Sequence, residues 1–273
     1  MKTLTLIGLF VPVPWIFEVH MQARWILPLL MLMAPVAQSS VVMAQPVPVQ
    51  TGGYLAGQAP VDILKLLPPP PAHNSPQDIA DRSVYAASAL GIGGTGWKAA
   101  QAQAATTSPA FMETLSCALG VKVSKETTPV TMDVLIRVLT DFGPPMSQAK
   151  TYYKRARPFT TDAGQACDPM VAAGQGDKLG FAYPSGHSGL GWLWALILGD
   201  AAPARAEPIR AWGQGVGDHR MDCRVHWSSD VAAGRILAVS VYDRVSMTPA
   251  YQADIKKVSA ELAKAPAITC PAG

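Results

Sequence analysis

The segment SGHSGLGWLWALILGD, residues 185–200, is apolar on every side when it is wound as a helix. Such a helix has no polar face for water, so other parts of the chain must surround it. Its start combines ordinary helix-start residues with a histidine, His187, in the first turn. The positive end of a helix disfavours a protonated histidine, and a nearby anion would explain its presence. The alternative is a capped helix whose histidine faces water.

The rest of the chain is predicted to be helical as well. Apolar residues recur at helical spacing, between Ser-Pro or Thr-Pro starts and Gly or Pro stops, in segments 75–90, 108–120, 127–143, 146–157, 228–245 and 249–265. Four consecutive prolines at 68–71 predict an extended strap along the surface. No alternating run is long enough for a sheet, so we expect a single-domain, all-α bundle of roughly eight helices.

Composition limits the kinds of partner. The 273 residues are 49% hydrophobic and only 15% charged, which is ample for one core. A net charge of +3 is small and dispersed, so it does not argue for nucleic acid or for a membrane surface as a partner.

Residues 1–44 are predicted to be a signal peptide. Arg24 supplies the basic region, the apolar stretch after it is too short to span a bilayer, and Ala44 ends a small-residue cleavage site. Met21 is a candidate for the true start, with a longer signal or a membrane anchor as alternatives. We expect residues 45–60 to form a flexible mature N-terminus and residues 61–273 to form the domain, in the periplasm or outside the cell.

Four cysteines in an exported chain predict two disulfides, with three possible connectivities. They are Cys117, Cys167, Cys223 and Cys270. None of them forms a CxxC pair, which disfavours a zinc or redox motif.

Three polar clusters are candidates for chemistry. In KTYYKRARPF, Lys150 and Arg157 are seven residues apart and would share one helical face, where they could bind one anion, although a solvated basic face is the commoner explanation. The turn from Pro184 to His187 offers backbone N–H groups at a helix start, with Gly186 leaving room for an oxyanion.

The third cluster is GDHRMDCRVHWSSD. His226 and Asp230 lie four residues apart and share a face if a helix begins near Val225. A carboxylate on one imidazole nitrogen fixes the tautomer and leaves the other nitrogen as a nucleophile or ligand. Two alternatives remain: a His–Asp pair that satisfies itself in a core, and a metal site made with His219.

The order Lys-x6-Arg-Pro, Pro-Ser-Gly-His and Arg-x5-His-x3-Asp resembles the signature of the type 2 phosphatidic acid phosphatase superfamily. This superfamily includes the bacterial class A non-specific acid phosphatases and the vanadium haloperoxidases. The segments LLPPPPAHNS, TDFGPPMSQAKTYYKRARPF, FAYPSGHSG and RVHWSSDVAAGR resemble class A segments in the same order, over about residues 60 to 245. The resemblance implies a helical enzyme that hydrolyses small phosphate monoesters at acidic pH, with broad specificity and without a metal or other cofactor.

Carried over residue by residue, the resemblance implies roles for the three clusters. The phosphate-binding residues are Lys150, Arg157, Ser185, Gly186 and Arg220. His226 becomes the nucleophile that forms a phosphohistidine, Asp230 its orienting partner, and His187 the acid that protonates the leaving oxygen. Cys223 lies inside the third motif and Cys167 in the loop between the first two, so we expect these two to pair, which leaves Cys117 with Cys270.

The chain departs from the family pattern at His219, where the pattern has serine before the third-motif arginine. This change puts substrate preference and pH profile in doubt. The rival functions are a vanadate-dependent haloperoxidase, a phosphotransferase or a membrane lipid phosphatase of the same superfamily, and a non-catalytic anion-binding protein. The sequence leaves a homo-oligomer open and predicts no stable membrane insertion after signal cleavage.

Overall fold

All regular secondary structure that the computed structural model describes, over residues 52–174 and 180–270, is helical apart from one isolated bridge between Val121 and Ala267. The all-α prediction is therefore confirmed. The predicted signal peptide, with its start at Met21 and its cleavage site at Ala44, lies outside the described residues. Within them, no helix is long and apolar enough to cross a bilayer.

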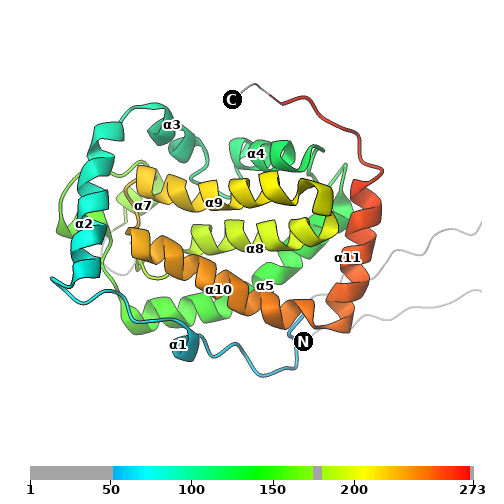
Figure 1. The fold of residues 1–273 in the computed structure, drawn as a ribbon, viewed down its shortest axis with the longest axis horizontal. Helices are drawn as coiled ribbons and strands as arrows, with labels where there is room; N and C mark the ends of the chain where they lie inside the picture. Colours follow the sequence, from blue (N-terminus) through cyan, green and yellow to red (C-terminus); the bar gives the residue numbers. More distant parts are fainter. Residues whose placement is uncertain (1–51, 175–179, 271–273) are drawn as a thin grey trace, which may run out of the picture. The chain divides into compact units, whose positions relative to one another are not determined.

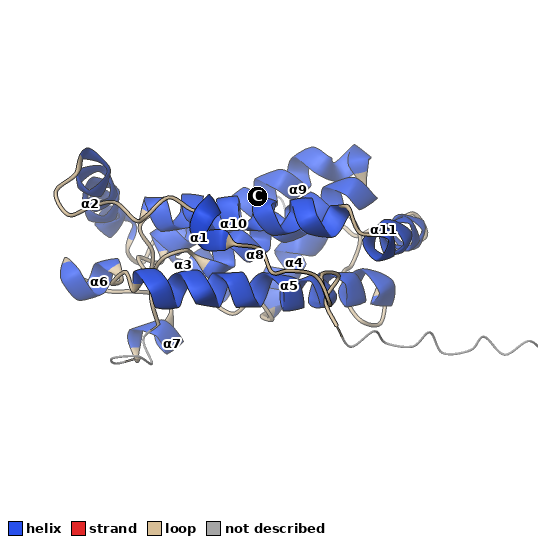
Figure 2. Cartoon of the chain, turned by 90° about the horizontal axis from the view of Figure 1, so that it is seen from below, coloured by secondary structure: helices blue, strands red, loops and turns tan. Residues whose placement is uncertain are grey.

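The helices are α1 (Ile63–Leu66), α2 (Pro76–Ser88), η1 (Ala89–Gly91), α3 (Thr95–Ala102), α4 (Pro109–Leu119), α5 (Pro129–Tyr153), α6 (Pro158–Thr161), α7 (Pro169–Ala172), α8 (Gly186–Ala201), η3 (Pro203–Arg205), α9 (Ala206–Asp222), α10 (Ser228–Ser246) and α11 (Pro249–Leu262). The apolar helix α8 lies between α9 and α10, with α2 and α11 crossing the two ends of this layer (Figure 1). In the turned view, α5 lies along the layer as a second layer (Figure 2). The prediction that α8 is surrounded is confirmed, since Leu193, Ile197 and Leu198 are fully buried.

Glycines allow α9 and α10 to approach the backbone of α8. A Cβ atom at Gly191 would lie 2.6 Å from the Cβ of Val216, and one at Gly234 would lie 2.4 Å from the carbonyl oxygen of Ser185. Both distances are far below ordinary van der Waals contact, so only glycine permits these helix pairs to pack so closely. Close packing on both sides buries most of α8, and Asp200 near its end is exposed.

The prediction of two helices, one ending at Gly143 and the next running from 146 to Pro158, is wrong. A single helix, α5, runs through Pro144 and Pro145 and ends at Tyr153. Its buried positions continue at helical spacing across the prolines, and they are Thr131, Val134, Leu135, Val138, Asp141, Phe142, Pro145 and Ala149. Burial of this continuous face outweighs the hydrogen bonds that two prolines cannot donate.

Part of the predicted flexible N-terminus packs on the domain at residues 53–55, whereas residues 56–60 are exposed. The backbone N–H groups of Tyr54 and Leu55 donate to the carboxylate of Asp141, at 2.7 and 3.0 Å, and both side chains are buried in the main core. The guanidinium of Arg137 lies 3.9 Å from the centre of the Tyr54 ring. A Cβ atom at Gly53 would overlap the Asp141 carboxylate, so this glycine serves close packing.

Both predicted disulfides are confirmed: Cys117 pairs with Cys270, and Cys167 pairs with Cys223. The second bridge joins the loop before α7 to the end of α9. The proline strap lies where it was expected, with the carbonyl of Pro68 accepting a 2.6 Å hydrogen bond from the Tyr183 hydroxyl.

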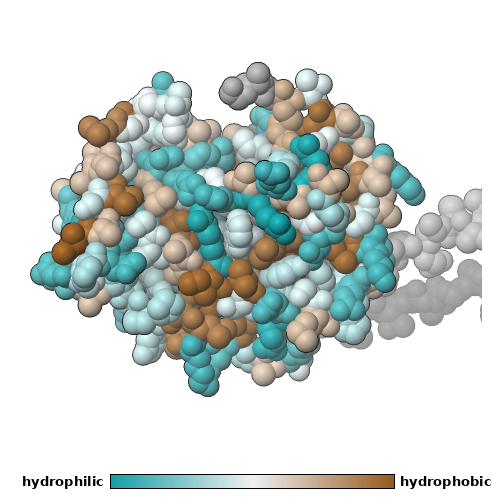
Figure 3. Space-filling view, viewed as in Figure 1, coloured by the Kyte–Doolittle hydropathy of each residue, from teal (hydrophilic) through white to brown (hydrophobic). Residues whose placement is uncertain are grey.

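Apolar side chains also gather on the surface over α10 and α1 (Figure 3). The exposed large apolar residues of these two helices are Leu66, Ile236 and Val239.

Candidate active site

Four helix ends meet at one end of the bundle, beside α2 and α3. They are the N-terminal ends of α8 and α10 and the C-terminal ends of α5 and α9 (Figure 1). This arrangement brings the three predicted clusters together. Arg157, just after α5, contacts His226, just before α10, and the backbone N–H of Ser185 donates to the carbonyl of Asp230 at 3.0 Å.

His226 is buried and holds one nitrogen toward the cations. Nε2 lies 3.2 Å from Nη1 of Arg157, and Nδ1 lies 3.4 Å from Oδ2 of Asp230. Because a guanidinium can only donate, Nε2 must be the acceptor and the proton resides on Nδ1. Burial, followed by the charge of Arg157, lowers the pKa of His226 well below its ordinary value. The imidazole is therefore neutral, with its lone pair directed at the cation cluster.

The His226–Asp230 pair forms by a different route from the predicted one. The helix begins at Ser228, with Trp227 as its N-cap, so His226 lies outside it. Asp230, the third helical residue, turns its carboxylate back and accepts the Trp227 N–H at 2.8 Å. The same oxygen faces His226, so the local helix start fixes the pair.

Arg155 and Asp81 extend this pair into a buried network. Arg155 donates to Oδ1 of Asp230 at 2.7 Å and to Oδ2 of Asp81 at 2.8 Å. Ser228 and Ser229 also donate to the Asp81 carboxylate. Burial raises the pKa of Asp230 to about 6, and the charge of Arg155 opposes that rise. Neither Arg155 nor Asp81 was predicted as a site residue.

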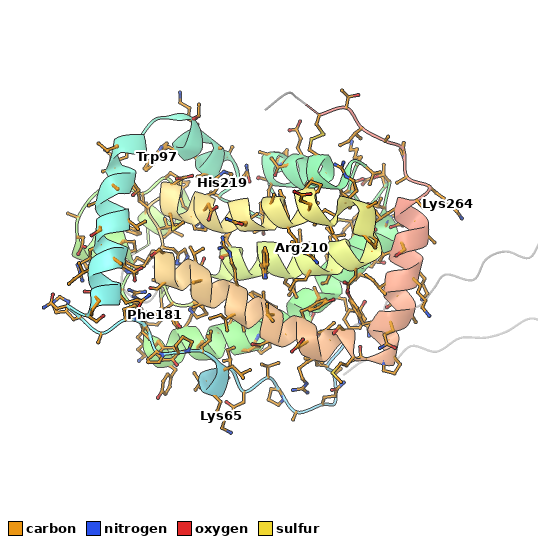
Figure 4. The ribbon with its side chains drawn as sticks, in the orientation of Figure 1. Lys65, Trp97, Phe181, Arg210, His219 and Lys264 are labelled. Carbon is orange, nitrogen blue, oxygen red and sulfur yellow. A yellow bond between two sulfur atoms is a disulfide. The ribbon has the colours of Figure 1, made fainter. Side chains whose placement is uncertain are left out.

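Lys150, Arg157 and Arg220 form the predicted cluster of cations, although Lys150 and Arg157 do not share a helical face as we expected. Lys150 is in the last turn of α5, and Arg157 follows in an extended segment. The Lys150 ammonium donates to the carbonyl of Phe181 at 2.5 Å (Phe181 is labelled in Figure 4), and Arg220 pairs with Asp168 at 2.8 Å.

The electrostatics of this cluster are those of an anion site. Burial, and then the charge of Arg157, lowers the pKa of Lys150 to about 7. Burial, and then the charge of Arg220, lowers the pKa of Arg157 to about 10. Buried cations that destabilise one another in this way gain from a bound anion. The start of α8 adds a positive helix end, where Ser185 is buried and a Cβ atom at Gly186 would lie 2.8 Å from the Met146 sulfur.

His187 is in the first turn of α8, and its Nε2 lies 2.9 Å from the carbonyl oxygen of Ala104. A carbonyl can only accept, so Nε2 carries a proton and Nδ1 is the nitrogen that can exchange one with a ligand. Burial, followed by the charge of Arg220, lowers the pKa of His187 to about 3. The ring is neutral in this cationic surrounding, and a bound dianion would raise its pKa.

Beside His187 lies a small pocket lined by Gln103, Phe111, Val216, His219 and Arg220. His219 lies near the end of α9 that approaches α3 (Figure 4). The alternative metal site with His226 and Asp230 gains no geometric support, since no group of three or more His, Cys, Asp or Glu in the described ranges could hold a metal ion.

Comparison with known proteins agrees with this geometry. Residues 132–247, from α5 to the end of α10, match the model of the PAP2 superfamily. A non-specific acid phosphatase of Salmonella typhimurium is 34% identical over 197 residues, which are 72% of this chain and 78% of the relative. One from Providencia stuartii is 32% identical over 218 residues, or 77% and 85% of the two chains, and an acid phosphatase of Zymomonas mobilis is 31% identical over 204 residues, or 75% and 76%. The chain therefore belongs to the PAP2 superfamily, in the family of the bacterial non-specific acid phosphatases.

Proposed function

We propose that this protein is an acid phosphatase that hydrolyses small phosphate monoesters, with broad specificity, through a phosphohistidine intermediate. One observation carries the proposal: Nε2 of His226 is unprotonated, and its lone pair faces a cluster of buried cations. A neutral imidazole is a good nucleophile, and the cations can bind the oxygens of the group that it attacks. Family membership supports the same reaction.

In the proposed reaction, particular atoms carry out each of the two steps. In the first, Nε2 of His226 attacks phosphorus, the bond from phosphorus to the leaving oxygen breaks, and that oxygen takes a proton from Nδ1 of His187. In the second, water attacks the phosphohistidine, gives a proton to His187 and restores the imidazole while phosphate leaves. Lys150, Arg157 and Arg220 neutralise the phosphoryl oxygens throughout.

The charge of the substrate makes His187 a competent acid. Burial, and then the charge of Arg220, lowers the pKa of His187 to about 3. A phosphate dianion cancels part of the positive charge around His187 and raises its pKa. His187 therefore becomes protonated when substrate binds. Acidic pH increases the protonated fraction of His187, in agreement with an acid phosphatase.

We also propose that the mature protein resides in the periplasm or outside the cell after cleavage near Ala44, without stable membrane insertion. The bacterial acid phosphatase relatives and the two disulfides support this location. Intact-mass analysis of the exported protein tests it, and a product that retains residues 1–44 would contradict it.

An assay with p-nitrophenyl phosphate at acidic and neutral pH tests the activity itself. We expect turnover that survives EDTA and is inhibited by orthovanadate, which takes the place of the phosphoryl group on His226. A protein that brominates substrates with added vanadate and hydrolyses no phosphate ester would instead be a haloperoxidase. Loss of turnover on chelation, restored by zinc or magnesium, would support a metal site.

A further inference from the structure

In the proposed reaction, the leaving group of the substrate lies toward the pocket beside His187. Arg220, on one side of it, is in the phosphate-binding cluster, and His187 supplies the proton to the leaving oxygen. Both residues line the pocket. The part of the substrate beyond that oxygen therefore faces the remaining lining residues, Gln103, Phe111, Val216 and His219.

The pocket offers a rigid apolar wall and two polar side chains. Phe111 is fully buried, and the rings of Trp212 and Trp194 pack edge-on against it, with centroids 5.4 and 6.1 Å away. Gln103 and His219 contribute an amide and an imidazole to the same lining. A leaving group with both carbon and hydroxyl groups suits such a lining.

One nitrogen of the His219 imidazole is not used in a hydrogen bond within the described residues. Its Nδ1 is buried, and the described residues provide it with no hydrogen-bond partner. A buried polar atom without a partner is costly, and a ligand that supplies one is bound more tightly. Burial lowers the pKa of His219, against the opposing charges of Asp222 and Asp218, so the ring is neutral and can exchange a hydrogen bond with a hydroxyl.

We infer that His219 is a specificity-determining residue that hydrogen-bonds a hydroxyl of the leaving group, and so favours phosphate esters of polyhydroxy alcohols over those of plain alkyl alcohols. This inference rests on the proposed phosphatase activity. It also gives a physical role to the position at which the chain departs from the serine of the family pattern.

Two nearly isosteric replacements test this role. In His219→Asn the side-chain amide keeps a polar atom near the position of Nδ1, whereas in His219→Leu a methyl group replaces it. The readout is the ratio of kcat/KM for glycerol 1-phosphate to that for propyl phosphate, which cancels any general change in activity. We expect the ratio to fall by about three- to tenfold in the leucine variant, the value of one neutral hydrogen bond, and to stay within about twofold in the asparagine variant.

His73→Leu is the matched control, because this histidine side chain is 75% exposed and lies two residues after the proline strap. It should leave the ratio unchanged. An unaltered ratio in His219→Leu, or an equal fall in the leucine and asparagine variants, would overturn the inference. If the unmodified protein hydrolyses neither ester, the proposed function fails instead, so the two failures are distinguishable.

Discussion

The two histidines of the site have opposite surroundings. Behind His226, a chain of buried ionic contacts runs through Asp230 and Arg155 to Asp81. Asp81 and Asp230 are 1% and 0% exposed, and each accepts several hydrogen bonds. The side chain of His187, by contrast, has one hydrogen bond within the described residues, to the carbonyl of Ala104. It lines the same pocket as His219, whose buried Nδ1 has no hydrogen-bond partner among those residues.

This difference shows which histidine already has its reactive geometry and charge before substrate binds. Attack by His226 requires one tautomer and one direction, so its network holds both fixed in the folded protein. Proton delivery by His187 requires a positive charge that burial and Arg220 disfavour, and the substrate supplies the compensating anion. The nucleophile side is preorganised, whereas the acid side is completed by the ligand.

Removing the nucleophile should have the largest effect. We expect His226→Ala to abolish turnover of every substrate, because no covalent intermediate can form. Single-turnover rates with p-nitrophenyl phosphate and with an alkyl phosphate measure this. Equal residual turnover above background for both esters would show that another group attacks phosphorus.

Removing the acid should have an effect that depends on the leaving group. General acid catalysis contributes about 10²–10⁴-fold, so His187→Ala should lose much of that range with an alkyl phosphate. The loss should be distinctly smaller with p-nitrophenyl phosphate, whose leaving group departs as an anion. The same assays decide this, and equal losses for the two esters would contradict the assigned role.

Arg155→Ala breaks the network behind the nucleophile. The variant leaves two buried carboxylates without their shared cation, so the pKa of Asp230 should rise further and the acid limb of the pH profile should move to higher pH. We expect kcat to fall about 10–100-fold, the usual cost of losing such a supporting partner.

Arg82→Ala is the matched control for Arg155→Ala. Each guanidinium lies 5.4 Å from the centre of the Trp227 ring, but Arg82 pairs with Asp78 and Asp162 instead of Asp230. We expect its pH profile to keep its position. A matching shift in both variants would mean that Arg155 acts only through packing on Trp227.

A smaller effect should appear in phosphate inhibition as pH changes. Burial, and then the charge of Arg157, lowers the pKa of Lys150 to about 7, so the ammonium is charged below that pH and loses its charge above it. Inhibition by inorganic phosphate, corrected for the ionisation of phosphate, should weaken by up to about tenfold per pH unit above 7. Lys150→Gln should remove this dependence, whereas Lys154→Gln, at an exposed position, should retain it. A dependence that persists in Lys150→Gln would assign it to another group.

Local signals in the sequence predicted the helical fold and the residues that we propose to bind phosphate. The predicted Ser-Pro helix starts are confirmed. Ser75 and Ser108 accept hydrogen bonds from the backbone N–H groups three residues later, at 3.2 and 3.1 Å. The expected number of helices was also close, since eight helices in the described residues have eight or more residues. Two of them, α3 and α9, were not among the expected segments. Glycine lowers helix propensity, and Gly213 in α9 is there because a Cβ atom would lie 2.8 Å from the Gly191 carbonyl oxygen.

The features that were missed depend on contacts between distant parts of the chain. Arg155 and Asp81 are 74 residues apart and meet only because α2 packs beside the start of α10. The Ala104 carbonyl reaches His187 across 83 residues, and no side-chain pattern marks a backbone acceptor. For the same reason, the prolines within α5 were interpreted as a break, although the buried face that carries the helix through them is set by its neighbours.

Trapping the intermediate tests the central claim most directly. The protein is mixed with substrate, quenched under alkaline conditions that preserve phosphohistidine, digested and mapped by mass spectrometry. We predict a phosphoryl group on His226 in the unmodified protein and none in His226→Ala. A phosphoryl group on His187, or turnover in the unmodified protein without any phosphoenzyme, would contradict the account.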